Sequence, residues 1–285
     1  MAVASTSNRA TPLPQAGSGD ALLVVDNIAM RFHTAEGGVA ALDNVSFTVS
    51  PGEFLAVIGP SGCGKSTLFN VIGGLLGGYD GKVSVAGEKV SGPHPSIGMV
   101  FQEESTFPWR NVVDNVAFPL EIAGVGKRER IDRARHFVSM VGLDGFEKRY
   151  PSELSGGMRQ RVSMARTLAS EPKILLMDEP FAALDEQTRL LLGDKVLQIQ
   201  QQLKQTTLLI THNLTEAVQL ADRILVMTYR PGRVKRMVDI NLPRPRTSEV
   251  VSSEAFGRYV AQIWADLREE ASRGMVDAET RALRA

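Results

Sequence analysis

The sequence contains a single cysteine and no excess of charge of either sign. Cys63 has no second cysteine to pair with in a chain of 285 residues, so an intrachain disulfide and a cysteine-built metal site are both excluded. We expect a reduced, cytosolic setting. Basic and acidic residues number 32 each, so the overall charge does not favour nucleic acid or an anionic membrane surface as the main ligand.

Long hydrophobic runs are also missing. No apolar run approaches the ~20 residues that a helix needs to span a bilayer, and the N-terminus lacks the apolar core of a signal peptide. Any membrane role should therefore be peripheral. Residues 1–19 are rich in Ala, Ser, Thr, Pro and Gly, and we expect a disordered tail because they cannot offset the entropy lost on ordering. The chain length suits one large α/β domain with a subdomain, or two modest domains.

The most specific motif is the run GPSGCGKST, which fits G-x-x-x-x-G-K-[ST] at every fixed position. An apolar, β-prone segment at residues 53–58 precedes it and a helical pattern at residues 68–76 follows it, which is the context that the motif requires. Such a loop directs backbone N–H groups and a helix N-terminus at phosphate oxygens. It predicts a nucleotide site formed by Gly59, Pro60, Ser61, Gly62, Cys63, Gly64, Lys65, Ser66 and Thr67.

A second stretch, KILLMDEP at residues 173–180, predicts a buried parallel strand that ends in two adjacent carboxylates. Ligands of open α/β sheets bind at such strand ends. Lys65 should reach the β- and γ-phosphates of a nucleotide, while Ser66 and Asp178 should hold Mg²⁺ from opposite sides. Glu179 should orient and deprotonate an attacking water. The structural alternative for the two carboxylates is a helix cap or a turn.

Three further residues lie at the ends of predicted strands. Gln102 follows a strand at residues 97–101, His212 follows one at residues 207–211, and Phe32 ends the first β segment. Each has an ordinary structural alternative: a loop glutamine, a structural histidine and a core aromatic. On the residues alone, a core position is favoured for Phe32 over stacking on a nucleotide base.

Residues 103–160 differ in composition from their flanks and predict an inserted helical subdomain. It closes on the run LSGGMRQ, in which Ser155, Gly156 and Gly157 precede a helical segment. Ordinary helix capping and anion binding both use such residues, so the pattern alone leaves the two open. Residues 247–285 follow a proline break and predict a helical extension. Its apolar side should pack on the chain's own surface and comprises Phe256, Val260, Ile263, Trp264 and Leu267.

With GPSGCGKST, LSGGMRQR, ILLMDEP, the segment AALD that ends at Asp185, and His212 in this order, residues 21–246 closely resemble the nucleotide-binding subunits of ABC transporters. The resemblance implies an α/β fold: a RecA-like phosphate-loop ATPase core with an antiparallel β subdomain and the inserted helical subdomain, together spanning residues 20–246. It implies ATP and Mg²⁺ as ligands. It also implies that Gln102 senses magnesium and the attacking water, that Phe32 stacks on adenine, and that His212 acts as the γ-phosphate switch.

The same resemblance implies partners. A head-to-tail homodimer would close Ser155, Gly156 and Gly157 of one copy on the ATP held by Lys65 of the other, with Asp185 communicating across the interface. The dimer would dock peripherally on a transmembrane permease at the cytoplasmic face of the inner membrane. A periplasmic or lipid-anchored solute-binding protein would act indirectly.

Several stretches resemble one importer group within the family. Met158 departs from the commonest signature, which has glutamine there, but methionine occurs among importers of nitrate, sulfonates and taurine. The stretches FPWRNVVDNV, LADRILVMTYRPGRV and LPRPR also resemble that group. They indicate small oxyanions as the transported solutes, with thiamine-precursor importers as a close alternative. The transported solute does not touch this subunit, so its identity is not encoded here.

Two other classes of protein are disfavoured by the sequence. A soluble ABC-type ATPase of DNA repair or of ribosomes is disfavoured by the single nucleotide domain, the short helical insertion and the absence of a basic excess. A phosphate-loop kinase is disfavoured because no acceptor lid is apparent and Glu179 suits water activation. For Trp109 two alternatives stay open: a cap on the small core of the helical subdomain, or, with Arg110, an exposed pair that docks on the permease.

Overall fold

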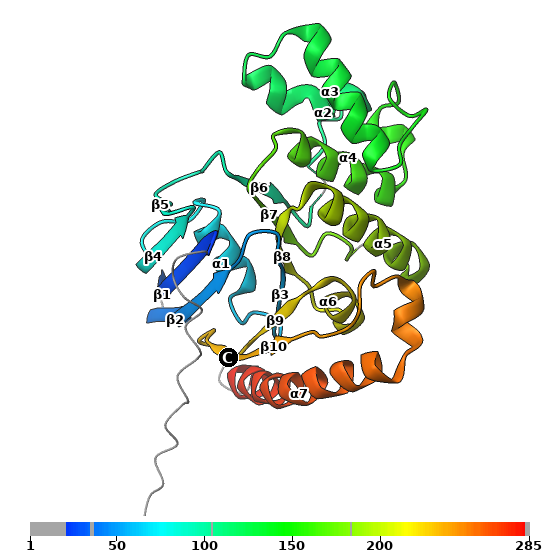
Figure 1. Cartoon of the computed structure of the whole chain (residues 1–285). Helices are drawn as coiled ribbons and strands as arrows, with labels where there is room; N and C mark the ends of the chain where they lie inside the picture. The colour runs from blue at the N-terminus through cyan, green and yellow to red at the C-terminus, as the bar shows by residue number, and fades with distance from the viewer. Residues whose placement is uncertain (1–20, 35–36, 104, 183, 283–285) are drawn as a thin grey trace, which may run out of the picture.

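The computed structural model describes residues 21–34, 37–103, 105–182 and 184–282. The disordered tail expected at residues 1–19 lies outside these ranges. The described chain is built on two sheets, with helices between them and on the outer face of the larger one (Figure 1). The expected fold, with an antiparallel β subdomain beside a parallel core, is confirmed.

The smaller sheet is antiparallel and has the strand order β2-β1-β4-β5. In the second half of β2, buried residues alternate with partly exposed ones, as expected of a sheet with one face on the core. Beyond the Met30–Leu42 pair, the end of β1 and the start of β2 lie beside the phosphate loop. Its strands are β1 (Leu23–Thr34), β2 (Gly37–Val49), β4 (Asp80–Val85) and β5 (Glu88–Lys89).

The larger sheet has the order β10-β9-β3-β8-β7-β6, and every pair except β10–β9 is parallel. Strand β3 is buried at all of its positions, because a central parallel strand is covered on both faces. Consequently the carboxyl ends of β3, β7 and β8 meet at one edge. The strands are β3 (Phe54–Ile58), β6 (Ile97–Val100), β7 (Ile174–Asp178), β8 (Thr206–Ile210), β9 (Arg223–Met227) and β10 (Val234–Asp239).

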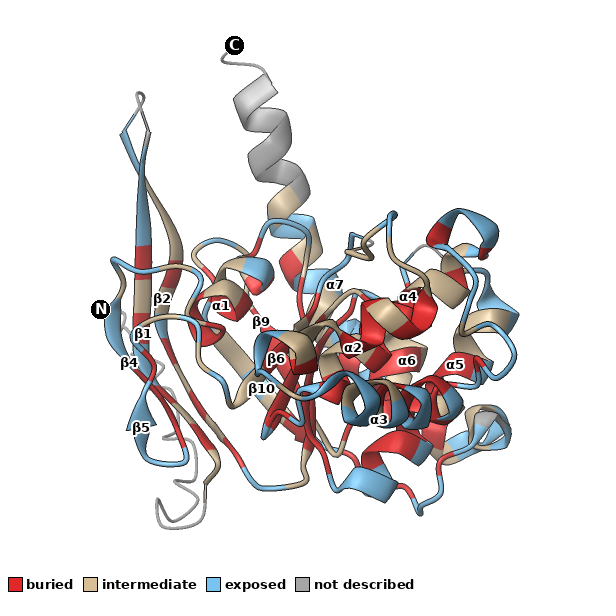
Figure 2. Ribbon diagram, turned by 90° about the horizontal axis from the view of Figure 1, so that it is seen from above, coloured by how far each residue is buried: buried red, intermediate tan, exposed pale blue. Residues whose placement is uncertain are grey.

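Helix α1 (Lys65–Ile72) lies between the two sheets, and its buried face contributes to the core that they share (Figure 2). It begins three residues earlier than the expected helix at residues 68–76, since the phosphate loop leads directly into its first turn. It ends at Gly73, and Gly74 has a φ of +71°, a left-handed conformation that suits glycine after a helix. The two glycines therefore end the helix, four residues before Leu76.

A helical layer covers the far end of the larger sheet (Figure 1). Helices α2 and α3 pack on each other and on α4 through small and branched apolar residues. Pro119 lies inside α2, although a proline commonly ends a helix. The layer comprises α2 (Val112–Ile122), α3 (Lys127–Met140), the short 3₁₀ turn η1 (Pro151–Glu153) and α4 (Gly156–Ala169).

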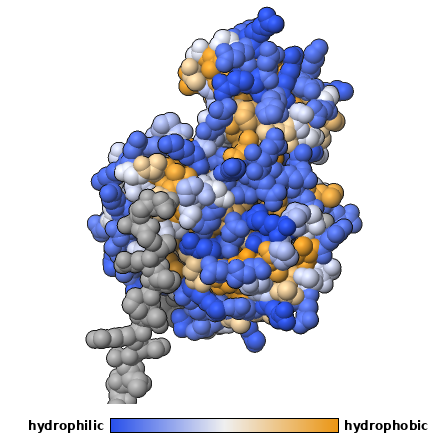
Figure 3. Space-filling view, viewed as in Figure 1, coloured by the Kyte–Doolittle hydropathy of each residue, from blue (hydrophilic) through white to orange (hydrophobic). Residues whose placement is uncertain are grey.

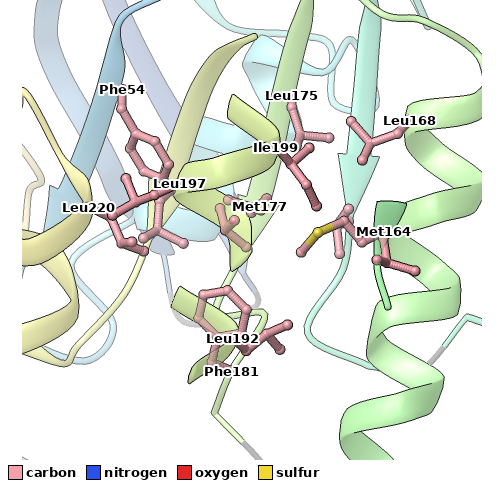
Figure 4. Packing of buried hydrophobic residues seen from close by; sticks show 14 of the residues in the cluster. Phe54, Met164, Leu168, Leu175, Met177, Phe181, Leu192, Leu197, Ile199 and Leu220 are labelled. Carbon is pink, nitrogen blue, oxygen red and sulfur yellow. The ribbon is translucent and has the colours of Figure 1, made fainter. Parts of the chain in front are cut away.

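The second core lies where α4, α5 and α6 cover the larger sheet, and Figure 4 shows Phe54 of β3 and Met177 of β7 packed among leucines of these helices. The C-terminal helix adds Phe256 and Ile263 to this core, so the expected packing of the extension on the chain's own surface is confirmed at those positions. The elements are α5 (Glu186–Leu203), α6 (Leu214–Leu220), η2 (Ser248–Ser252) and α7 (Glu254–Ala282).

Trp264 does not share that apolar side, and its expected place there is wrong. Its side chain is 56% exposed, whereas Ile263 is fully buried. Neighbouring helical residues are rotated by about 100°, so a helix that directs Ile263 at the core turns Trp264 away from it.

None of the described helices is long and apolar enough to cross a bilayer, and the face in Figure 3 is mostly hydrophilic.

Candidate active site

A pocket of about 320 Å³ opens where the two sheets meet the start of α1. Its floor is the phosphate loop, and its walls come from the edge of the antiparallel sheet, from the end of β7 and from the turn between β9 and β10. The lining residues are Phe32, Val39, Ala41, Ser61, Gly62, Gly64, Lys65, Ser66, Thr67, Glu179 and Arg230. Six of the nine predicted phosphate-loop residues therefore line the pocket, together with Phe32 and Glu179.

The loop takes its shape from a glycine that no other residue can replace. Gly64 has a φ of +101°, and a Cβ at this position would lie 2.8 Å from the Ala41 carbonyl oxygen. Both the backbone conformation and the close approach to β2 exclude a side chain. Gly64 is also the residue that precedes the first turn of α1, so the loop delivers the helix N-terminus to the pocket.

Lys65 is almost completely buried, with 8% of its surface exposed. Its Nζ donates to the Gly59 carbonyl at 2.8 Å and to the Pro60 carbonyl at 3.1 Å. Gly59, Pro60 and Cys63 thus lie behind the lysine and do not line the pocket. Burial raises the pKa of the Cys63 thiol, so this cysteine is a packing residue and stays protonated.

Ser66 and Asp178 lie side by side, although they come from different elements. Burial raises the pKa of Asp178, and this effect outweighs the nearby Ser66 hydroxyl and the charge of Lys65, which both lower it. A hydroxyl and a partly desolvated carboxylate are hard oxygen donors, and a cation beside them would offset the cost of burying the charge. The donor set therefore fits Mg²⁺.

Glu179 and His212 are neighbours at the ends of β7 and β8. The Glu179 Oε2 atom lies 3.0 Å from His212 Nδ1, and the Glu179 backbone N–H donates to the Ile210 carbonyl at 2.9 Å. Glu179 has a φ of +44°, a conformation that is rare for residues with side chains and that is found at functional sites. This backbone turn directs the carboxylate into the pocket.

Phe32 and Gln102 have different surroundings. Phe32 is 38% exposed and forms part of the pocket wall, so the core position favoured from the sequence is wrong and the side chain is available to a nucleotide base. The reason is local: the residue lies near the end of a strand that projects past the core. Gln102 is exposed two residues after β6 and is not among the residues that line the pocket.

The signature residues lie on the helical layer and outside the pocket. Ser155 caps α4 and accepts from the Met158 N–H at 3.3 Å, which is the capping role left open above. Gly157 is buried, and a Cβ there would lie 3.2 Å from Leu184 Cδ2. Asp185 caps α5 by accepting from the Thr188 N–H at 2.9 Å, and this bond holds the pKa of Asp185 below its usual range. The signature and the segment around Asp185 therefore form one packed unit.

Three residues of the pocket were not expected from the sequence: Val39, Ala41 and Arg230. Arg230 lies in the turn between β9 and β10, and its Nε donates to the Gly62 carbonyl at 2.8 Å. The stretch TYRPGRV was informative only as a family resemblance, because nothing in its composition indicates that it reaches the phosphate loop. Val39 and Ala41 are plain strand residues, so no signal in the sequence distinguishes them.

A buried carboxyl is bonded to Thr211, the residue that precedes His212. Glu216 on α6 is 7% exposed, and its Oε2 accepts from the Thr211 hydroxyl, while its Oε1 has no hydrogen-bond partner among the described residues. Burial raises the pKa of Glu216 to about 7. This effect outweighs the Thr211 hydrogen bond and the Arg189 charge, which both lower the pKa. The Thr211 hydroxyl also accepts from the Asn213 N–H at 3.0 Å, so this cluster brackets His212 on both sides.

We expect Glu216 to make stability depend on pH. A carboxyl whose pKa rises from 4.5 to about 7 on folding stabilises the fold fully below pH 4.5, and this contribution is lost as the pH rises through 7. The loss amounts to about 3 kcal/mol. Glu216→Gln should remove this dependence, so its free energy of unfolding in urea should gain on wild type between pH 5 and pH 8. The exposed Glu254→Gln serves as the control, and parallel pH profiles of wild type and Glu216→Gln would contradict the expectation.

A strand, a phosphate loop and a helix, with a carboxylate pair at the end of another parallel strand of the same sheet, define a phosphate-loop nucleotide hydrolase. Comparison with known proteins narrows this class to one family. A family profile described as ABC transporter matches residues 42–182. An uncharacterized ABC transporter ATP-binding protein of Methanocaldococcus jannaschii is 49% identical over 244 residues, which cover 86% of this chain and 91% of the relative.

Two further relatives have named solutes. The nitrate import ATP-binding protein NrtD of Synechocystis sp. is 43% identical over 252 residues, which cover 86% of this chain and 95% of the relative. The taurine import ATP-binding protein TauB of Shigella sonnei is 46% identical over 208 residues, with coverages of 73% and 82%. A dimeric ATP-binding cassette in a post-hydrolysis state, bound to ADP and Pi, has a TM-score of 0.69 at 31% identity and covers 78% of this chain and 100% of that one.

The chain belongs to the ABC transporter family, and the resemblance drawn from its motifs is confirmed. It is an ATP-binding subunit and an ATP hydrolase of the kind that powers transport.

Proposed function

We propose that this chain energises an importer for small oxyanions, such as nitrate or taurine and other sulfonates. The names of its relatives support this solute class, since nitrate and taurine importers are similar to it over most of its length. The proposed place of the subunit is the cytoplasmic face of the cell membrane, docked on a permease that receives solute from a separate binding protein. The subunit would supply the work through ATP-driven closure of a homodimer.

The need for two copies follows from the separation of two anion-binding elements. The phosphate loop lines the pocket, whereas Ser155, Gly156 and Gly157 lie outside it with the segment around Asp185. Each element occurs once in the sequence, so a second copy is needed to bring a signature onto a bound ATP. The dimeric state of the similar cassette supports this arrangement.

The chemistry proposed for each residue follows from its position. Lys65 would release its loop carbonyls to bind the β- and γ-phosphates, and its charge is already desolvated for that purpose. Glu179 would accept the proton of the attacking water, while His212, 3.0 Å away, would donate to the γ-phosphate. Ser66 and Asp178 would hold Mg²⁺, which neutralises charge on the phosphates when bound. Gln102 lies outside the pocket, and its role at the same ion rests on the family resemblance alone.

The observation that carries the transport role is the surface around Trp109. Its side chain is 71% exposed, so the alternative in which it caps the subdomain core is wrong. The Trp109 ring packs against the Phe107 ring, with 5.4 Å between their centroids. The Phe107 ring in turn contacts the Phe118 ring at 4.7 Å between centroids. Arg110 does not share the exposure of Trp109: its side chain is 28% exposed, and its guanidinium bonds Glu121 at 2.7 Å.

The loop that presents Trp109 is held rigidly. Asn115 is fully buried, accepts from the Phe107 N–H at 2.8 Å and donates to the Arg110 carbonyl at 2.8 Å. One amide thus fixes both ends of the turn that contains Trp109. A large aromatic held in place before binding loses little conformational entropy when a partner covers it, which is the property of an interface hot spot.

Uptake measurements test the proposed function. A strain that lacks this gene should lose accumulation of labelled nitrate or labelled taurine and regain it with the wild-type gene. The Lys65→Ala gene, expressed at the same level, should fail to restore uptake. Unchanged uptake of every oxyanion tested in the deletion strain would contradict the solute class, while purified subunit that hydrolyses ATP would still support the family assignment.

A further inference from the structure

The turn between β9 and β10, residues 228–233, carries two arginines with different surroundings. Arg233 is bonded to Asp43 through Nε at 2.9 Å and through a second guanidinium nitrogen. Arg230 forms no ion pair with any carboxylate in the part of the chain that the structure describes, and it lines the nucleotide pocket. An arginine without an acidic partner, beside a loop built for phosphate, retains donors for an anion.

Arg230 also contacts the phosphate loop directly. Its Nε donates to the Gly62 carbonyl at 2.8 Å, so the guanidinium lies along the loop, next to residues that precede Lys65. This bond uses Nε, and the two terminal nitrogens form no hydrogen bond within the described residues, so they remain available to an anion in the pocket that Arg230 lines. The contact joins residues 168 positions apart and constrains a glycine-rich segment that would otherwise lose more entropy when a nucleotide orders it.

The turn is anchored on two sides, which keeps Arg230 in place. On one side, the Gly232 N–H donates to the Ala41 carbonyl at 2.9 Å, and the Asp43 N–H donates to the Gly232 carbonyl at 3.0 Å. The turn is thereby joined to β2, the strand that supplies Ala41 to the pocket wall.

On the other side, the C-terminal helix holds the residue that precedes Arg230. Glu270 of α7 is 2% exposed, its Oε2 accepts from the Tyr229 N–H at 2.9 Å, and its Oε1 accepts from Lys235 Nζ at 2.8 Å. The Tyr229 ring lies against Gly274 of the same helix. A buried carboxylate that accepts a backbone N–H and an ammonium group is costly to disturb, so α7 fixes the turn firmly.

We propose that Arg230 is a further nucleotide-binding residue, which holds the phosphate loop through Gly62 and donates to the nucleotide phosphates, and that Glu270 of the C-terminal helix is its positioning residue. The phosphates are the favoured ligand because the arginine lies along the phosphate loop and shares the pocket with Lys65. The extension of residues 247–282 thereby acquires a role in nucleotide affinity.

The decisive experiment compares Arg230→Gln with Arg233→Gln, two matched changes within one turn. Binding of fluorescent ADP and ATP analogues to the purified full-length subunit should weaken roughly 10- to 100-fold in Arg230→Gln, which is the usual worth of a hydrogen bond to a charged group. Arg233→Gln should bind as wild type does. Equal affinities of Arg230→Gln and wild type, or an equal loss in Arg233→Gln, would overturn the proposal.

Two further measurements separate the phosphate contact from other causes. Inorganic tripolyphosphate should compete with the ATP analogue in wild type and lose potency in Arg230→Gln, whereas a contact to the base alone would leave its potency unchanged and contradict the proposal.

Glu270→Gln should raise the KM for ATP by a smaller factor with little change in kcat, and a fall in kcat alone would contradict the positioning role. If Arg230→Gln has a lower melting temperature than wild type, Arg230→Lys provides the test. Lysine keeps the charge but lacks the forked guanidinium that could bond Gly62 and a phosphate at once. Arg230→Lys should therefore still bind the ATP analogue several-fold more weakly than wild type. Wild-type affinity in Arg230→Lys would then count against the two-sided contact.

Discussion

Replacing Glu179 with glutamine is expected to lower kcat for ATP hydrolysis by about 10²- to 10⁴-fold, which is the usual contribution of a positioned general base. The glutamine keeps the size of the side chain and its hydrogen-bonding reach to His212, now 3.0 Å away, but it cannot accept a proton from water. Binding of ATP should persist, because Lys65 and the loop amides are untouched. Steady-state hydrolysis and binding of an ATP analogue measure the two effects separately.

The matched control is Glu186→Gln, a carboxylate at the start of α5 whose side chain is 63% exposed and pairs with Arg189. It should hydrolyse ATP at nearly the wild-type rate. Turnover in Glu179→Gln equal to that of wild type would remove Glu179 from the role of base, whatever the control shows.

Replacing Trp109 with alanine is expected to abolish solute uptake and co-purification with the permease while leaving basal ATP hydrolysis and the melting temperature nearly unchanged. The side chain is largely exposed and contacts its own chain mainly through the Phe107 ring, so its loss removes little folding energy. At an interface, however, truncation of a central tryptophan costs at least 2 kcal/mol, about 30-fold in affinity.

Trp264→Ala is the control for this experiment, since Trp264 is also an exposed tryptophan, 56% accessible, and lies on α7 at the opposite end of the molecule from α2 and α3 (Figure 1). It should not affect uptake. A large fall in the melting temperature of Trp109→Ala, or an intact complex with normal uptake, would show that Trp109 does not dock on the permease.

The features that the sequence predicted correctly depend on short contiguous segments. The phosphate loop and its flanking strand and helix are specified within about twenty residues, because glycine positions and apolar runs determine a local backbone shape. The same holds for Asp178 and Glu179, which follow four buried residues of one strand. Parallel strands place their carboxyl ends on one edge, so the meeting of β3, β7 and β8 also follows from the order of elements.

Tertiary structure alone decided features that join distant segments or depend on burial. Arg230 reaches Gly62 only because the turn after β9 is paired to β2 and held by α7. Phe32 lines the pocket because its strand extends beyond the core. Trp264 faces solvent because the packing of α7 on the core buries Ile263 and fixes the rotation of the helix. Glu216 of α6 owes its raised pKa to desolvation by the residues packed around it, a property of the surroundings and not of the residue. Sequence patterns specify which residues are apolar and which chemistry is present, but the partner of a side chain is settled only when the sheets, helices and turns pack.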